Sequence, residues 1–131
     1  MRAVTTGTAA FALGIPRKEL DNILSRYPIR GFERKRQGLA RRISQASIEQ
    51  VAVAIDLSRD YSIPMPTALL LAEEALASRE GIIQSPGGHL ALHVDLERIR
   101  RSVQAKLTEA IEYVIPPRRG RPPLREQAGE A

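Results

Sequence analysis

Four side chains in one short segment have the chemistry that recognition of a nucleic acid requires. They are Arg17, Lys18, Asn22 and Arg26. A guanidinium or ammonium group can bind a phosphate, and an asparagine amide can pair with the edge of adenine in the major groove of DNA. Each residue alone could equally belong to a solvated helix face, so the prediction depends on the four together.

A second group of cations lies in a segment, residues 29–43, whose sequence predicts a small hairpin with its tip at residues 35–38. A charged run is more often simply solvated surface. Beside a DNA-binding helix, however, such a hairpin would act as a wing on the phosphate backbone or the minor groove. Its cations are Arg34, Lys35 and Arg36 near the tip, with Arg41 and Arg42 at the exit.

The C-terminal segment contains a third basic motif, centred on Arg119, Gly120 and Arg121 between prolines. This core resembles the AT-hook, in which glycine lets the backbone enter a narrow minor groove and the arginines follow its floor. The alternative is a Pro/Arg-rich solubility tail. From residue 116 onward the composition predicts an extended, disordered tail.

Other chemistry finds little support in the sequence. There are no cysteines, and no phosphate loop or nucleophile motif is present. His89 and His93 would suit a zinc pair on a helix, but the alternating pattern around them predicts a strand, where they would lie about 13 Å apart. We therefore expect no metal, no cofactor and no enzymatic activity.

The charge is distributed unevenly along the 131 residues. The formal net charge is +5, with +7 in residues 1–42 and −4 in residues 43–94. An anionic partner would therefore meet the N-terminal third first. No run of apolar residues is long enough to cross a membrane, and a cytoplasmic, nucleoid-associated location is expected.

The elements that must position these residues begin with two short helices. Thr5 or Thr6 can cap the first helix, Gly14 ends it, and Pro16 suits the first position of the second. A helix-turn-helix also requires a small residue in the first helix and apolar residues that lock the second. Ala10 fits the first role, and Ile15, Leu20 and Ile23 fit the second.

The rest of the chain predicts two further helices, a hairpin and a final helix. A third helix follows Ser44, with Ile48, Val51, Ala52 and Ile55 inward. A fourth follows Pro66, with Leu69, Leu70, Ala72 and Leu76 inward. A second hairpin turns at residues 85–88 before the alternating Leu90, Leu92 and Val94. The last helix, about 95–115, carries an apolar stripe of Leu96, Ile99, Val103, Leu107, Ala110 and Val114.

Residues 5–15, followed after a basic loop by residues 41–51, resemble the opening, wing exit and third helix of MerR-type winged helix-turn-helix regulators. The resemblance covers about residues 4–78 and implies a recognition helix over 16–26. The chain departs from the family at Asp21, Asn22 and Ile23, where an Arg and paired aromatic residues are usual. Base contacts therefore do not transfer, and an excisionase-like relative fits better than a metal sensor.

Together these patterns predict a mainly α fold with small β-hairpins: a winged helix-turn-helix (1–78), a hairpin with a dimerisation helix (79–115) and an AT-hook-like tail (116–131). The predicted function is a sequence-specific regulator of transcription that binds double-stranded DNA as a homodimer or higher oligomer. In the alternative to dimerisation, the last helix folds back on the body. Two other functions stay open: an architectural or recombination-accessory DNA-binding protein, and an antitoxin-like adaptor that binds a protein through the last helix.

Overall fold

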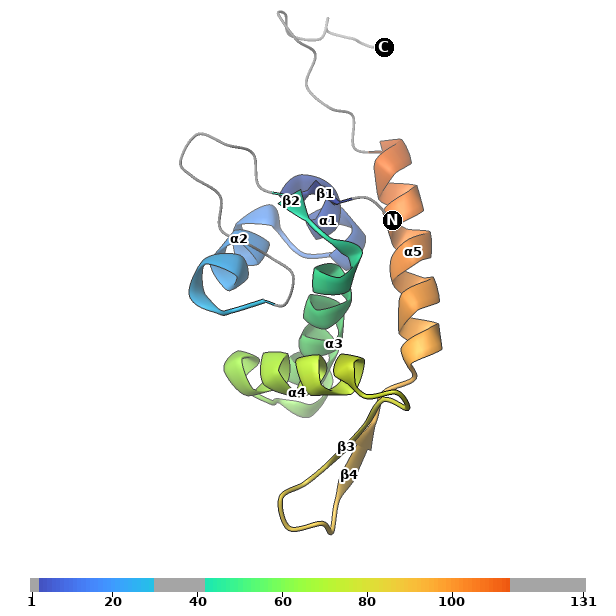
Figure 1. Cartoon of the computed structure of the whole chain (residues 1–131). Helices are drawn as coiled ribbons and strands as arrows, with labels where there is room; N and C mark the ends of the chain where they lie inside the picture. The colour runs from blue at the N-terminus through green and yellow to red at the C-terminus, as the bar shows by residue number, and fades with distance from the viewer. Residues whose placement is uncertain (1–2, 30–41, 114–131) are drawn as a thin grey trace, which may run out of the picture.

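Helices dominate the computed structural model, which describes residues 3–29 and 42–113 (Figure 1). Within these residues there are five helices and two pairs of short antiparallel strands, as the predicted class requires. The helices are α1 (Thr6–Leu13), α2 (Arg17–Arg26), α3 (Gln45–Tyr61), α4 (Met65–Ala77) and α5 (Leu96–Tyr113). The strands are β1 (Val4–Thr5), β2 (Arg42–Ile43), β3 (Ile82–Gln84) and β4 (Ala91–His93).

The turn between α1 and α2 forms as the sequence predicts. The Thr5 side chain accepts a hydrogen bond from the Thr8 amide, and Gly14 ends α1 with φ of 72°. Because glycine has no Cβ, it adopts this left-handed conformation without a steric penalty and lets the chain reverse direction. Pro16 precedes the first residue of α2 rather than occupying it, a shift of one position. Ala10 is buried and allows α1 and α2 to pack closely.

The first strand pair joins the two ends of the N-terminal unit. Val4 pairs with Ile43 and Thr5 with Arg42, so the chain returns to its start before α3 begins. Ser44 then caps α3 by accepting a hydrogen bond from the Ser47 amide, as expected. Most of the predicted wing, residues 30–41, lies outside the described residues.

Helix α4 packs against α3 along an apolar seam. The buried amide of Gln50 on α3 donates a hydrogen bond to the Leu69 carbonyl oxygen, at 3.1 Å, and links the two helices. Leu69 and Ala72 face inward as predicted, but the prediction for Leu70 is wrong, since its side chain is 61% exposed. Successive helical residues diverge by about 100°, so Leu69 and Leu70 do not share a face.

Helix α5 folds back along the body and covers α1 and α3 (Figure 1). Val103, Leu107 and Ala110 of its apolar stripe are buried. The stripe is therefore not the exposed surface on which the predicted dimer and the predicted adaptor both depended. A homodimer stays a prediction that needs another surface.

The second strand pair forms the hairpin that the sequence predicts. Ile83 pairs with Leu92, and the turn lies between Gln84 and Ala91. Figure 1 shows this hairpin projecting from the body at the end opposite to β1 and β2. Among the other described elements, only α4 makes extensive contact with the hairpin, and it does so through β3.

Candidate nucleic-acid interface

One face of α2 holds the helix to the body, and the opposite face is open to solvent. Leu20, Ile23 and Leu24 are buried. Helical spacing places Lys18, Asn22 and Ser25 at the centre of the opposite face, and all three are exposed. The outward face of α2 therefore presents an ammonium group, an amide and a hydroxyl in one row.

Two cations flank this row. Arg17, in the first turn, is 69% exposed and its Nε lies 3.8 Å from a carboxylate oxygen of Asp21. An exposed pair at this distance holds the guanidinium only weakly, so Arg17 can exchange it for another anion. Arg26 lies in the last turn of α2, where the helix dipole favours a positive charge.

Apart from Arg17, the predicted contact residues of α2 are not neutralised by other described residues. Among the described residues, Lys18, Asn22 and Arg26 have no ion pair or side-chain hydrogen bond. Glu19 and Asp21 lie on the same helix, and they reduce its net charge to +1. The face is thus polar and weakly cationic.

The structure brings together only part of the predicted site. Arg17, Lys18, Asn22 and Arg26 share α2, and Arg42 is exposed on β2. The remaining predicted contacts, Arg34, Lys35, Arg36, Arg41, Arg119, Gly120 and Arg121, lie outside the described residues. Ser25 was not among the predicted contacts, although its seven-residue spacing from Lys18 could have indicated it.

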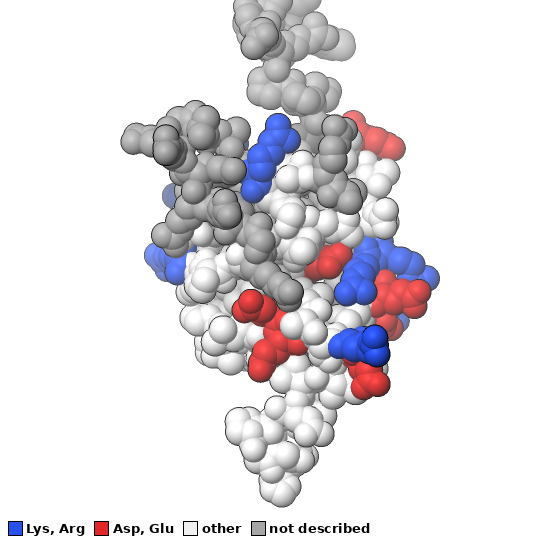
Figure 2. Space-filling view, in the orientation of Figure 1, with Lys and Arg blue, Asp and Glu red and all other residues white. Residues whose placement is uncertain are grey.

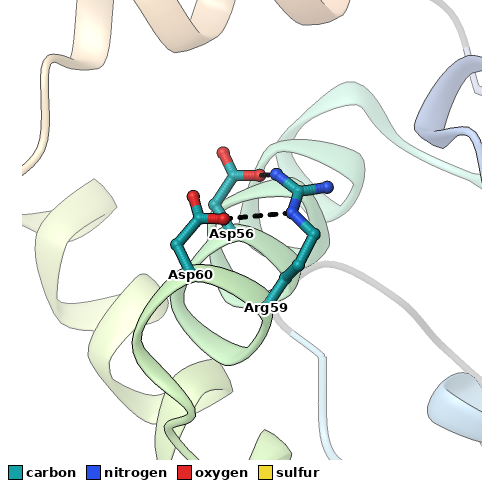
Figure 3. A network of polar contacts seen from close by, with 3 residues as sticks. All are labelled: Asp56, Arg59 and Asp60. Carbon is teal, nitrogen blue, oxygen red and sulfur yellow. Dashed lines mark hydrogen bonds and ion pairs between the residues drawn. The ribbon is translucent and has the colours of Figure 1, made fainter.

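The surface of α3 and α4 has the opposite charge. At the end of α3, Arg59 donates hydrogen bonds to Asp56 at 2.7 Å and to Asp60 at 3.1 Å (Figure 3). The hydrogen bond to Asp60 and the charges of both carboxylates raise the pKa of Arg59. One cation shared by two carboxylates leaves a net negative patch, and Glu73 and Glu74 of α4 add to the negative charge of this part of the chain. The net charge of α3 and α4 is negative and does not favour a polyanion.

One ion pair, between Glu49 and Arg100, also connects α3 to α5. The Glu49 side chain, 9% exposed, accepts a hydrogen bond from the Gln45 amide at 2.9 Å and lies 3.9 Å from Nε of Arg100. Figure 2 shows Lys and Arg side chains beside acidic ones at the right of the body, and no charged side chain on the projecting hairpin. The burial of Glu49 could not be expected from the sequence, because its position next to Ile48 gives no signal of burial.

Neither a metal-ligating cluster nor a membrane-spanning helix is found in the described part of the chain. Within residues 3–29 and 42–113, no cluster of three potential metal-ligating side chains is present. His93 lies on β4 and His89 lies in the turn before it. No helix among these residues has the length and apolar character needed to cross a bilayer.

Comparison with family models, with curated proteins and with solved structures gave no significant match to this chain.

Proposed function

We propose that this protein binds double-stranded DNA, with the outward face of α2 in the major groove. The observation that carries the proposal is that α2 has one face buried against the body and the opposite face exposed to solvent. Leu20, Ile23 and Leu24 fix the helix to the body, while the opposite face presents Lys18 and Asn22 without partners among the described residues. An exposed helix of this kind, held rigidly after a tight turn, has the geometry of a recognition helix.

The neighbouring elements support the same proposal. The segment between α2 and β2 carries Arg34, Lys35, Arg36 and Arg41, and it begins and ends on the described body at Ile29 and Arg42. In the proposal it forms the wing, as the resemblance to MerR-type regulators implies. Its cations would contact phosphates and position α2, while Asn22 and Arg17 read bases.

The proposed role is regulation of transcription at specific sites. An architectural or recombination-accessory protein would use the same surfaces but would spread along DNA, so its footprint would lengthen with protein concentration. A regulator would protect a fixed length at a fixed stoichiometry. Nuclease footprinting over a concentration series separates these two roles.

The first test compares two double variants matched in residue type. Lys18→Ala/Asn22→Ala removes the centre of the α2 face, whereas Lys106→Ala/Gln104→Ala removes an exposed lysine and an exposed amide from α5. A binding sequence is first recovered by sequencing the DNA that the purified protein retains from a random pool. Fluorescence anisotropy with that duplex then measures the dissociation constant of each protein.

We expect the α2 variant to bind at least about tenfold more weakly and to lose discrimination between selected and random DNA, because a good base contact contributes about 1–3 kcal/mol. The α5 variant should bind as the natural sequence does. Equal effects of the two variants, or none, would contradict the assignment of α2. Failure of the pool to enrich any DNA would contradict DNA binding itself.

A further inference from the structure

The outer edge of β4 is an unpaired strand edge. In the hairpin, the Val94 amide donates to the Gly81 carbonyl and the Ser85 amide donates to the Leu90 carbonyl. With Ile83 opposite Leu92, these bonds direct the backbone groups of residues 90, 92 and 94 towards β3. The amides and carbonyls of Ala91 and His93 therefore point away from the hairpin, and no backbone hydrogen bond to another described element satisfies them.

The edge of β3 differs, because the body reaches it. Ile82 donates its amide to the Ser78 hydroxyl at 3.4 Å, and β3 contacts α4. Of the two hairpin edges, only that of β4 thus faces away from the rest of the described chain. A two-stranded hairpin with a bare edge is marginal in water and gains stability from a third strand.

The hairpin also lacks the charges that normally protect such an edge. No residue from Gly81 to Val94 is charged, whereas 27% of the whole chain is. Proteins usually place lysine or another charge on an exposed edge to prevent pairing with a second chain. The neutral hairpin gives a polyanion nothing to bind, and it permits close approach of an identical copy without repulsion.

Strand β4 is complementary to itself in antiparallel register. With Leu92 on a twofold axis, Ala91 would form a hydrogen-bonded pair with His93 of the second copy, and the reverse pair would form by symmetry. Leu90, Leu92 and Val94 share one face of the strand. Leu92 would then lie opposite its counterpart, and Leu90 opposite Val94 of the second copy.

The burial of these residues fits an incomplete apolar row. Leu92 and Val94 pack partly against the core, but Leu90 is 73% exposed. A second copy would extend the row across the axis and cover Leu90 with an apolar side chain.

We infer that the protein forms a homodimer in which the two β4 strands pair antiparallel and join the two hairpins into one four-stranded sheet. The dimer follows from the hairpin alone and does not depend on DNA binding. It also supplies the surface that the covered stripe of α5 does not.

Two substitutions in the full chain test the inference without DNA. Ala91→Pro removes an amide that points outward from β4 but keeps the hydrogen bonds between β3 and β4. Its control is Gln84→Pro, which removes an outward amide from the opposite edge, on β3. Leu90→Lys places a charge in the apolar row. Its control is Leu70→Lys, which changes a similarly exposed leucine beside Tyr27 and Pro28, at a groove that is the rival docking surface.

Light scattering after gel filtration and sedimentation velocity, from about 1 to about 100 µM, should give the natural chain twice its monomer mass at the upper concentrations. We expect Ala91→Pro to weaken the dimer roughly thirtyfold, because two hydrogen bonds are lost per dimer. Leu90→Lys should weaken it roughly tenfold or more, and Gln84→Pro and Leu70→Lys should leave it unchanged. Circular dichroism checks that each variant is folded.

A monomer at every concentration would overturn the inference, as would a dimer that survives both Ala91→Pro and Leu90→Lys. Dissociation by Leu70→Lys alone would place the interface on α4 instead. Failure of DNA binding would show separately, because the folded monomeric variants keep the α2 face and should retain binding to a single half-site.

Discussion

Two glycines with the same backbone conformation have different surroundings. Gly14 and Gly81 have φ of 72° and 73°, a region that side chains other than glycine's rarely adopt. A Cβ at Gly14 would meet nothing within 4 Å, whereas one at Gly81 would collide with the Val94 carbonyl oxygen at the base of the hairpin. Position 14 requires glycine only for its backbone torsion, whereas position 81 requires it also because there is no room for a Cβ.

We predict that Gly81→Ala lowers the free energy of unfolding by at least about 3 kcal/mol, and Gly14→Ala by about 1–2 kcal/mol. Both variants have the cost of a positive φ at alanine, but only Gly81→Ala also has the collision of the new Cβ with the Val94 carbonyl oxygen. Urea denaturation of both variants at one protein concentration measures the two values. Equal losses would contradict the tight base of the hairpin.

Much of the local structure at this scale could be predicted from the sequence. Thr5, Gly14 and Ser44 mark helix ends because their side chains or torsions act on adjacent backbone. The buried pair of Glu49 and Gln50 could not be predicted, because their partners Arg100 and Leu69 lie far along the chain. A polar residue gives no local signal that distant groups will satisfy it.

At the scale of elements, α5 packs against other helices of its own chain and forms part of their core. Its stripe meets α1 and α3, and Leu107 at the centre of the stripe is fully buried. Periodicity predicted that this face would be covered, and that prediction is confirmed. It could not identify what covers the face, because spacing within a helix contains no information about the partner surface.

Leu107→Ala should lower the free energy of unfolding by about 3 kcal/mol, through lost burial and the cavity that remains. Because the covering helices belong to the same chain, the loss should be the same at low and at high protein concentration. The matched control is Ile111→Ala, one turn later on the same helix, where the side chain is 54% exposed and the change should be within about 0.5 kcal/mol. Thermal and urea unfolding at two concentrations measure both, and a loss that appears only at high concentration would assign the stripe to a dimer.

At the scale of the whole molecule, the uncharged hairpin lies at one end of the described body and the basic tail is attached at the other. Figure 1 shows the end of α5 at the same end as β1 and β2, with the uncharged hairpin at the other. The basic tail after residue 116 is therefore attached to the described body at this end, and the basic segment 30–41 rejoins the body there at Arg42. In the proposed complex, DNA would approach that end and the second copy would approach the hairpin.

Arg119→Ala/Arg121→Ala should weaken DNA binding and leave the fold intact. Removing two phosphate or minor-groove contacts should reduce the slope of log affinity against log salt by about 2. The effect should be largest on duplexes with A/T-rich flanks, where the minor groove is narrow and most negative. Anisotropy titrations from low to moderate salt measure the slope, and an unchanged slope would assign the tail to solubility alone.

The packing of α5 on α1 also has a consequence for biosynthesis. The inner face of α1, near the start of the chain, is completed by residues that the ribosome adds about a hundred positions later. Until then Ala9 and Ala12 lack part of their cover, so the N-terminal helices cannot reach their final stability on the nascent chain. The packing of α1 is therefore completed only after α5 has emerged from the ribosome.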